Sequence, residues 1–518
     1  MSKSLNITTP LYYVNAAPHI GHSYTTVAAD CLARYHRLNG EPVFFLTGTD
    51  EHGQKIEQAA RAAGLEPKAF TDQTAQIFHA LWKTLNISYD RFIRTTDADH
   101  IRVVQRALEQ LRPQLRQGLS TFFYCVPCET QWAPSDLVDP QAPACPSCQR
   151  PIERVEEENF FLALEPHRRW LAAHLTARPS FIPPDVRRNE LLALLEQPLP
   201  DLCLTRPKAR LAWGIEVPFS RAHVTYVWVD ALLNYITAAG YGTTAFESRW
   251  PADVHVIGKD ILRHHGLYWP IILHALGLSD EQMPRMIFAH GWWTVGEQKM
   301  SKSRGNIVDP TVVIKEFLKD QPYAVDAYRY FLLREVPFGQ DGSFSEEAIT
   351  KRLETDLAND LGNLLHRTLS MIDRYCDGRL PAPGPVGCAV DDVPLRAAAL
   401  GLAAHLDERM AQLDFSGALA RIFQLVTQAN RYIESQAPWQ LAKASDPSRL
   451  HTVLSVLAEV IRVAAVVLDP FMPAVAEAIW SQLGLGETPR RLRDTTQWPG
   501  CTPGRPVGTR AVLFPRKP

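Results

Sequence analysis

The sequence contains no uninterrupted apolar run of about 20 residues, the length that a helix needs to cross a bilayer. Its first residues, MSKSLNITTPLYYV, lack the charged start, apolar middle and small-residue cleavage site of a signal peptide. They also do not form an Arg-rich amphipathic transit sequence. These absences argue against a membrane-spanning or secreted protein, and we expect a cytoplasmic protein with no membrane partner.

The sequence also lacks an excess of charge of either sign, because 54 basic and 56 acidic residues leave a formal net charge of -2. This balance does not exclude nucleic acid as a partner, since a local basic face can bind RNA within a nearly neutral protein. Hydrophobic residues make up 46% of the 518 residues, which is enough to fill several cores. A chain of this length suggests about three or four domains.

Cysteine is scarce, and the nine cysteines are an odd number, a pattern that favours a metal site over disulfides in a reducing compartment. Four of them form two Cys-x-x-Cys pairs, Cys125 with Cys128 and Cys145 with Cys148, with sixteen residues between the pairs. Four thiolates at this spacing match a closed zinc knuckle, so we expect one structural Zn²⁺. The alternative, four free cysteines, does not explain the paired spacing. The other five are scattered: Cys31, Cys203, Cys376, Cys388 and Cys501.

The N-terminal segment has the alternation of an α/β protein. Leu5 to Val14 is rich in β-branched and aromatic residues and predicts a strand, which Asn15 to Pro18 ends. His22 to Leu38 predicts a helix, and Pro42 to Thr47 predicts a second strand. Units of this kind usually form parallel sheets.

An inserted module interrupts this pattern from about residue 117 to residue 150, where periodicity fades and prolines and cysteines accumulate. We expect the α/β pattern to return at His223 to Val229 and at Asp253 to Ile257. The sequence therefore predicts a split, Rossmann-type catalytic domain with a parallel sheet and a zinc-bearing insertion.

After about Ser345 the chain is predicted to be helical throughout. Ser345 is a plausible N-cap, and Phe415 to Ile433 and Val453 to Leu468 have helical periodicity. A C-terminal all-α bundle follows, with Leu380 to Val393 as a connector rich in proline and glycine. One apolar stripe recurs every four residues: Ile349, Leu353, Leu357, Leu361, Leu365 and Leu369.

These patterns predict six segments. They are 1–115, the first half of the catalytic domain; 116–222, the insertion, with the knuckle at about 122–151; 223–325, the second half; 326–350, a connecting segment; 351–500, the helical domain; and 501–518, a tail.

The segment Pro18-His19-Ile20-Gly21-His22 lies between the first strand and the first helix, where nucleotides bind in parallel-sheet proteins. Backbone N–H groups at a helix start attract phosphate, and Gly21 would let an adenine approach the backbone. His19 and His22 could donate to phosphate oxygens in the transition state. The alternative is that the two histidines only cap the helix, which four residues alone would favour.

The segment Lys299-Met300-Ser301-Lys302-Ser303 lies between Gly296 and Arg304-Gly305-Asn306 and predicts a mobile basic loop. Such a loop could bind ATP through Ser301 and Ser303 and neutralise the departing pyrophosphate with Lys299 and Lys302. The alternative is a solvated basic turn.

Together, in this order, the two motifs resemble the signatures of class I aminoacyl-tRNA synthetases. Within that class the chain resembles the bacterial methionyl-tRNA synthetases almost end to end. The resemblance implies a ligase that activates methionine with ATP to methionyl-adenylate, releases pyrophosphate and transfers methionine to the 3′-terminal adenosine of tRNA(Met) for initiation and elongation. Mg²⁺ would accompany ATP without a protein cage. The blocks that carry the resemblance are Thr8–Asn15, Leu46–Gly53, Tyr226–Ala231, Ile257–Ile261 and Asn430–Ile433.

The resemblance also implies a methionine site. Asp50 would bind the ammonium group, and Gly258 with Asp260, at a strand end, would contact ATP and its ribose. The alternative for the aromatic residues of this site is ordinary core packing. The residues implied for the side-chain pocket are Leu11, Tyr13, Trp228, Tyr235 and His265.

Three residues of the helical domain are implied to contact the CAU anticodon. Asn363 and Arg367 lie four apart, two positions off the apolar stripe, so they share one exposed face of their helix. Trp439, after Ala437-Pro438, offers a ring on which a base could stack. Without the resemblance, a solvated helix face and a buried tryptophan would be the better explanation. The resemblance also implies that residues 326–350 contact the stem of the RNA.

The sequence alone leaves two alternative functions open. One is a class I synthetase for another amino acid, although the chain has no room for the large editing insertion of the isoleucyl, leucyl and valyl enzymes. The resemblance implies instead that homocysteine is rejected at the synthetic site. The other rival is a tRNA-binding protein that has lost catalysis, against which the intact histidine and lysine motifs argue. No dimerisation domain follows the bundle, so we expect a monomer.

Overall fold

The computed structural model describes residues 3–126, 130–132, 137, 139, 143–146, 148–296, 298–299, 307–384, 390–445, 447–486 and 488–516. The chain folds into two compact units. The sheet unit comprises Met1–Pro18, Phe44–Lys83 and Tyr89–His290. The helical unit comprises His19–Val43, Thr84–Ser88 and Gly291–Pro518.

A six-stranded sheet forms the centre of the sheet unit. Its order is β13–β12–β1–β3–β2, and β4 also pairs with β3. The pairs β13–β12, β12–β1, β3–β2 and β3–β4 are parallel. The sequence VFFLTGTD of β3 is buried along nearly its whole length, as expected for a strand covered on both faces. The strands are β1 (Leu5–Thr8), β2 (Tyr12–Tyr13), β3 (Val43–Asp50), β4 (Arg91–Arg94), β12 (Val254–Gly258) and β13 (Ile287–His290).

Helices cover this sheet with their apolar faces. In α4 (Ala98–Leu111), Val104, Leu108 and Leu111 recur at helical spacing, and all three are buried in one continuous core. That core also contains residues of β3 and of two later helices, α8 (Asn234–Ala239) and α10 (Trp269–Ala275). Two further helices of the unit are α2 (Gln54–Ala62) and α3 (Pro67–Thr84).

The predicted insertion forms an antiparallel sheet of its own, in the order β6–β5–β7–β8. Its long hairpin pairs Leu115 with Leu162 at one end and Tyr124 with Glu153 at the other. The strands are β5 (Leu115–Cys125), β6 (Thr130–Trp132), β7 (Glu153–Leu162) and β8 (Leu202–Cys203), and the helices α5 (Glu165–Ala177) and α6 (Asp185–Leu195) lie between β7 and β8 in the chain.

The prediction that His223 to Val229 rejoins the parallel sheet was wrong. This segment belongs to β11 (Ser220–Thr225) and to the start of α7 (Val227–Leu232). β11 pairs antiparallel with β10 (Glu216–Val217) and β9 (Thr205–Pro207) in a separate three-stranded sheet. Only two residues separate β10 from β11, so a local hairpin captures the strand. The prediction for Asp253 to Ile257 is confirmed, because β12 lies in the parallel sheet.

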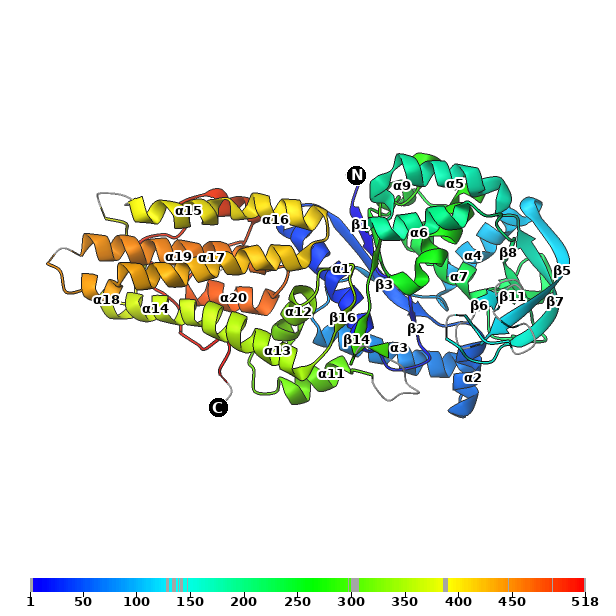
Figure 1. Ribbon diagram of the computed structural model, residues 1–518, viewed down its shortest axis with the longest axis horizontal. Coiled ribbons are helices and arrows are strands. Elements are labelled where there is room, and N and C mark those ends of the chain that lie inside the picture. The colour runs from blue at the N-terminus through cyan, green and yellow to red at the C-terminus, as the bar shows by residue number, and fades with distance from the viewer. Residues whose placement is uncertain are drawn as a thin grey trace. The chain divides into compact units, whose positions relative to one another are not determined.

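The helical unit contains the predicted bundle, in which α14, α15, α16, α17 and α19 run alongside one another (Figure 1). The described α-helices of the unit are α1 (Ile20–Leu38), α11 (Pro310–Val312), α12 (Ala324–Arg334), α13 (Glu346–Arg352), α14 (Asn363–Tyr375), α15 (Val393–Leu400), α16 (Leu402–Ala411), α17 (Phe415–Gln436), α18 (Pro438–Leu441), α19 (Ser448–Leu468) and α20 (Pro473–Gln482). Helix α19 is long and apolar enough to cross a membrane by composition alone, but nearly all of it is buried within the protein. It is the core helix of the bundle.

The apolar stripe of period four has a structural explanation. All six of its residues are buried, although a spacing of four exceeds the 3.6 residues of an α-helical turn. Between α13 and α14 the chain forms a π-helix, Leu353–Gly362, whose i→i+5 bonds widen the turn. The wider turns keep the stripe on one face.

One buried ion pair ties several segments of the helical unit together. Arg329 of α12 is fully buried, and its Nη2 lies 2.7 Å from Asp30 Oδ2 of α1. The same guanidinium donates to the carbonyl oxygens of Phe471, Leu85 and Pro470. Burial opposes ionisation of Asp30, but Arg329 and a neighbouring arginine lower the pKa of this carboxyl overall.

Replacing Arg329 by methionine should destabilise the helical unit by about 3 kcal/mol, because it removes one of the two arginines paired with the buried Asp30 carboxylate and leaves three carbonyl oxygens without their donor. Urea unfolding of the full chain measures this change. The matched control is Arg510→Met, which removes the exposed pair with Asp373 and should cost less than about 1 kcal/mol. Equal destabilisation by the two variants would contradict the central role of Arg329.

Candidate functional site

The two histidines of the first motif cap helix α1. His19 is the N-cap residue, and its Nδ1 accepts from Gly21 N at 3.1 Å, while His22 Nδ1 accepts from His19 N at 3.0 Å. A ring nitrogen that accepts carries no proton, so the proton of each neutral ring is on Nε2. A Cβ at position 21 would lie 2.9 Å from His19 Cε1, which explains the glycine. Capping therefore fixes both rings with an Nε2–H donor.

Both ends of the basic loop are attached near this helix start. Lys299, in β15 (Gln298–Lys299), pairs with Thr294 of β14 (Trp293–Val295). The indole of Trp293 meets the ring of Tyr24 in α1 edge to face at 5.7 Å. After the loop, Val308 O accepts from Ile20 N at 3.0 Å.

Most of the loop lies outside the residues that the structure describes. Met300, Ser301, Lys302 and Ser303 lie outside the described residues, and Lys299 is described by its backbone alone. The structure thus brings the flanks of the second motif to the first motif within one unit.

In the sheet unit, predicted ligands lie at the carboxyl ends of parallel strands. Asp50 ends β3 and is buried, and Gly258 ends β12. A Cβ at position 258 would lie 2.6 Å from Asp260 Oδ1, so the glycine lets this exposed carboxylate lie against the strand end. Gly258 is in register with His290 of the neighbouring strand β13.

Tyr235 and His265 form a buried hydrogen-bonded pair. Their Oη and Nε2 atoms are 2.8 Å apart, and His265 Nδ1 lies 3.0 Å from Ile261 O. A carbonyl oxygen can only accept, so Nδ1 carries the proton and Nε2 accepts from the tyrosine hydroxyl. Burial lowers the pKa of His265 to about 4. The pair is therefore neutral at neutral pH.

Trp228 stacks on His264, a residue that the sequence did not suggest. The ring centroids are 3.6 Å apart at an interplanar angle of 20°. Burial, together with the positive charge of neighbouring groups, lowers the pKa of His264, so this ring is neutral. Trp228 Nε1 and His264 Nδ1 are buried and have no hydrogen-bond partner in the described part of the chain. His264 begins a π-helical turn, His264–Tyr268, a feature that often marks functional sites.

The remaining predicted pocket residues join the same core. Leu11 and Tyr13 pack against the cluster that contains Tyr235 and Trp228. The Tyr13 hydroxyl donates to His52 O at 2.8 Å. All six residues predicted to bind methionine thus lie in one unit. Four of them belong to or pack against one hydrophobic cluster, His265 is hydrogen-bonded to Tyr235 of that cluster, and Asp50 lies at the end of β3.

The turn after Asp50 is held by Glu51, another residue that the sequence reasoning did not single out. Glu51 is fully buried, and Arg94 Nε and Nη2 donate to its two oxygens at 2.6 and 2.8 Å. Thr49 and Thr96 donate to the same carboxylate at 2.6 and 2.7 Å. The sequence did contain a signal for Glu51, because two consecutive acidic residues, Asp50 and Glu51, follow an apolar strand. An acid that is buried there must be held by fixed donors.

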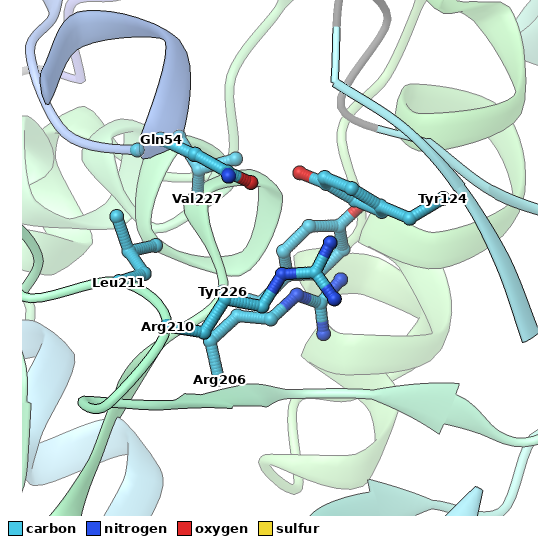
Figure 2. A pocket seen from close by; sticks show the side chains of 8 residues that line it. Gln54, Tyr124, Arg206, Arg210, Leu211, Tyr226 and Val227 are labelled. Carbon is cyan, nitrogen blue, oxygen red and sulfur yellow. The ribbon is translucent and has the colours of Figure 1, made fainter. Parts of the chain in front are cut away.

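A small cavity of about 10 Å³, the space one water molecule needs, lies between the starts of α2 and α7. Arg206 is buried, and its guanidinium lies 4.0 Å from the ring centroid of Tyr226. Figure 2 shows Arg206 and Arg210 running side by side, with Gln54 and Tyr124 pointing toward each other. The Arg206 guanidinium over Tyr226 braces the segment that leads into α7, and the Arg210 guanidinium lies over the ring of Tyr124.

Three of the four predicted zinc ligands come together. The Sγ atoms of Cys125, Cys145 and Cys148 all lie within 4.8 Å of one another, and those of Cys125 and Cys148 are 3.6 Å apart. A disulfide would need about 2.05 Å, whereas two thiolates on one tetrahedral zinc lie about 3.8 Å apart. Cys128 lies outside the described residues. The three thiols fit the predicted knuckle.

Two of the three predicted anticodon residues meet in the helical unit. The guanidinium carbon of Arg367 lies 5.8 Å from the ring centroid of Trp439, and Arg367 Nη1 pairs with Glu434 Oε1 at 2.6 Å. Trp439 is 37% exposed, so it is available for stacking and is not a buried core residue. Asn363 begins α14 one turn before Arg367 and is half-buried.

The low pKa of His265 has a consequence for stability. Between its ordinary pKa of 6.5 and its native value of about 4, the unfolded chain binds a proton that the native chain does not. The free energy of unfolding should therefore fall as pH is lowered through this window, by about 3 kcal/mol in total for this residue. Urea unfolding at several pH values should give a shallower slope for His265→Gln, and the exposed-site control His366→Gln should match the wild type. Equal slopes for all three proteins would contradict a buried neutral His265.

Comparison with known proteins identifies the family. Residues 5–156 and 113–369 match a family model described as tRNA synthetases class I (M), and residues 399–502 match the anticodon-binding domain of tRNA ligase. A methionine–tRNA ligase of Caldanaerobacter subterraneus subsp. tengcongensis is 47% identical over 100% of this chain and 79% of its own. One of Streptomyces coelicolor is 42% identical over 99% and 97%.

A solved structure agrees with the sequence relatives. Mycobacterium tuberculosis methionyl-tRNA synthetase in complex with methionyl-adenylate is 41% identical, with a TM-score of 0.93 over 99% of this chain and 100% of its own. Family models, full-length relatives and fold all agree. The chain belongs to the methionyl-tRNA synthetases of class I, which are methionine–tRNA ligases.

Proposed function

We propose that the sheet unit binds methionine, with Asp50 on the ammonium group and Leu11, Tyr13, Trp228, Tyr235 and His265 around the side chain. The observation that carries this assignment is the neutral Tyr235–His265 pair. Its polar atoms satisfy each other, so the two rings offer polarisable, uncharged surface to a thioether. The buried carboxylate of Asp50 supplies the negative charge that the ammonium group of methionine requires.

We propose that His19 and His22 donate through Nε2 to phosphate oxygens of ATP, with Gly21 and the helix start beneath them. Ser301 and Ser303 bind ATP, Lys299 and Lys302 neutralise the pyrophosphate, and Gly258 with Asp260 holds the ribose. The methionine carboxylate attacks the α-phosphorus, a P–O bond forms to methionine, and the bond to pyrophosphate breaks. Mg²⁺ accompanies ATP and supplies charge neutralisation.

In the second step, the 3′-terminal ribose hydroxyl of tRNA(Met) attacks the activated carbonyl carbon. The hydroxyl proton is lost, the ester bond forms and AMP leaves. The histidine and lysine donors act by position and charge, so the reaction needs no covalent enzyme intermediate.

The cysteine knuckle is assigned a structural Zn²⁺ held by Cys125, Cys128, Cys145 and Cys148. Supporting this, three of the thiols lie at zinc-binding separations at the end of the β5–β7 hairpin. A four-thiolate site leaves no coordination position for substrate, so the ion would stabilise the inserted module and take no part in the reaction.

The helical unit is proposed to bind the CAU anticodon through Asn363, Arg367 and Trp439. The exposed Trp439 ring beside the Arg367 guanidinium supports this, because such surfaces bind unstacked bases. We further propose the division at 115, 222, 325, 350 and 500 as the functional domains, a cytoplasmic location and a monomeric state.

Methionine-dependent ATP–pyrophosphate exchange tests the catalytic assignment. Methionine should support exchange in preference to isoleucine, valine and cysteine, and Lys302→Ala should lower the rate about a hundredfold, as expected for loss of one transition-state donor. Lys319→Ala removes an exposed lysine elsewhere and should leave the rate unchanged. No exchange from folded wild-type protein would refute the proposal.

Aminoacylation kinetics test the anticodon assignment separately. Trp439→Ala should raise KM for tRNA(Met) about tenfold or more, because stacking contributes about 1–3 kcal/mol per base. The exchange rate should stay unchanged, and Trp439→Phe, which keeps a ring, should recover most of the affinity. An unchanged KM for tRNA in Trp439→Ala would reject this role.

A further inference from the structure

A buried carboxylate in the sheet unit joins two histidines from distant parts of the chain. Asp230 of α7 lies 2.7 Å through Oδ2 from His52 Nδ1 and 2.7 Å through Oδ1 from His100 Nε2 of α4. Asp230 and His100 are 0% exposed and His52 is 5% exposed. Burial opposes ionisation, but the two imidazoles lower the pKa of Asp230, so the carboxylate stays charged.

The carboxylate of Asp230 fixes the hydrogen-bond directions in this triad. An ionised carboxylate oxygen can only accept, so His52 donates to Oδ2 through Nδ1 and His100 donates to Oδ1 through Nε2. The other ring nitrogen of His100, Nδ1, lies 3.1 Å from Thr237 Oγ1, and this contact holds the ring in place. Each Asp230 oxygen thus receives one N–H.

The triad connects the backbone segments that carry the residues proposed to bind methionine. His52 is two residues after Asp50, and its carbonyl oxygen accepts from the Tyr13 hydroxyl. Asp230 is two residues after Trp228 on the same short helix. His100 anchors the carboxylate to α4, which packs on the sheet. A shift of His52 relative to Asp230 would move the ammonium-binding end of the pocket relative to its aromatic wall.

We propose that the His52–Asp230–His100 triad positions Asp50 relative to Trp228 and thereby sets the affinity for methionine. The three are positioning residues, since they act through the segments that carry Asp50 and Trp228. The inference rests on the proposed assignment of Asp50 and Trp228 to methionine. A binding group is held precisely only when the residues that support it are themselves fixed. Small displacements of such a group lower the affinity for the ligand.

The decisive variant is His52→Phe, which keeps an aromatic ring beside Trp213 but removes the N–H to Asp230. Exchange kinetics on the full chain should show KM for methionine raised about tenfold or more, the effect of losing one hydrogen bond to a buried charge. KM for ATP should stay within about twofold, because the ATP groups are not attached to this triad. His52→Asn, which can place an amide N–H near the Nδ1 position, should restore methionine affinity to within about threefold.

Two controls separate positioning from general loss of stability. Glu459→Gln disrupts an equally buried ion pair with Arg462 in the bundle and should lower the unfolding midpoint without changing KM for methionine. Asp230→Asn, which removes the charge and keeps the shape, should raise KM for methionine as His52→Phe does. This second variant decides the matter if His52→Phe fails to fold.

The inference is overturned if a folded His52→Phe or Asp230→Asn has the wild-type KM for methionine. It is also overturned if Glu459→Gln raises that KM equally, or if His52→Asn is no better than His52→Phe. Asp50→Asn distinguishes this failure from that of the proposed function. If Asp50→Asn raises KM for methionine and His52→Phe does not, only the positioning role is wrong, whereas no effect of Asp50→Asn removes the methionine assignment itself.

Discussion

Parallel strands leave their carboxyl ends at one edge of a sheet, and this constraint determines where the sheet unit can assemble a site. Asp50 and Gly258 are more than two hundred positions apart, yet both end strands of the same sheet. The insertion can therefore occupy much of the sequence between them without disturbing the site. The chain leaves the parallel sheet after β4, passes through α4 and the insertion, and returns to the sheet at β12. The pairing of β12 with β13 then places Gly258 beside His290. The cysteine cluster belongs to this insertion, whose strands form sheets separate from the parallel one.

Helix capping and phosphate binding need not compete for the same residues. At the start of α1, the Nδ1 atoms of His19 and His22 accept backbone N–H groups, and this use of one nitrogen decides the state of the other. The rings are held with Nε2–H groups and cannot rotate freely, so the entropy of orienting two donors is already lost in the free protein. Gly21 belongs to the same arrangement, because any larger residue would collide with the capping ring.

The sequence allowed the fold class, the family and the reaction to be predicted, and all three are confirmed. Periodicity located β12 and the bundle helices, but it could not show that β11 pairs with a local hairpin, because strand propensity does not specify a partner. Resemblance supplied Tyr235 and His265, yet not the 2.8 Å bond between them, which fixes the tautomer. His52 and Asp230 are 178 positions apart, and no local pattern reports a contact of that separation. Their roles follow only from the three-dimensional arrangement.

Buried charges recur in both units, and their energetics argue for placement over stability. A buried ion pair gains little free energy against a well-packed apolar replacement, because desolvation offsets the attraction, whereas losing one partner is costly. Glu51 with Arg94, and Asp230 with its histidines, therefore contribute little net stability but make alternative positions of their segments expensive. In the sheet unit both networks hold the same turn, the one that follows Asp50. An apolar core could bury that turn equally well, but it would not fix the position of the Asp50 carboxylate that precedes it.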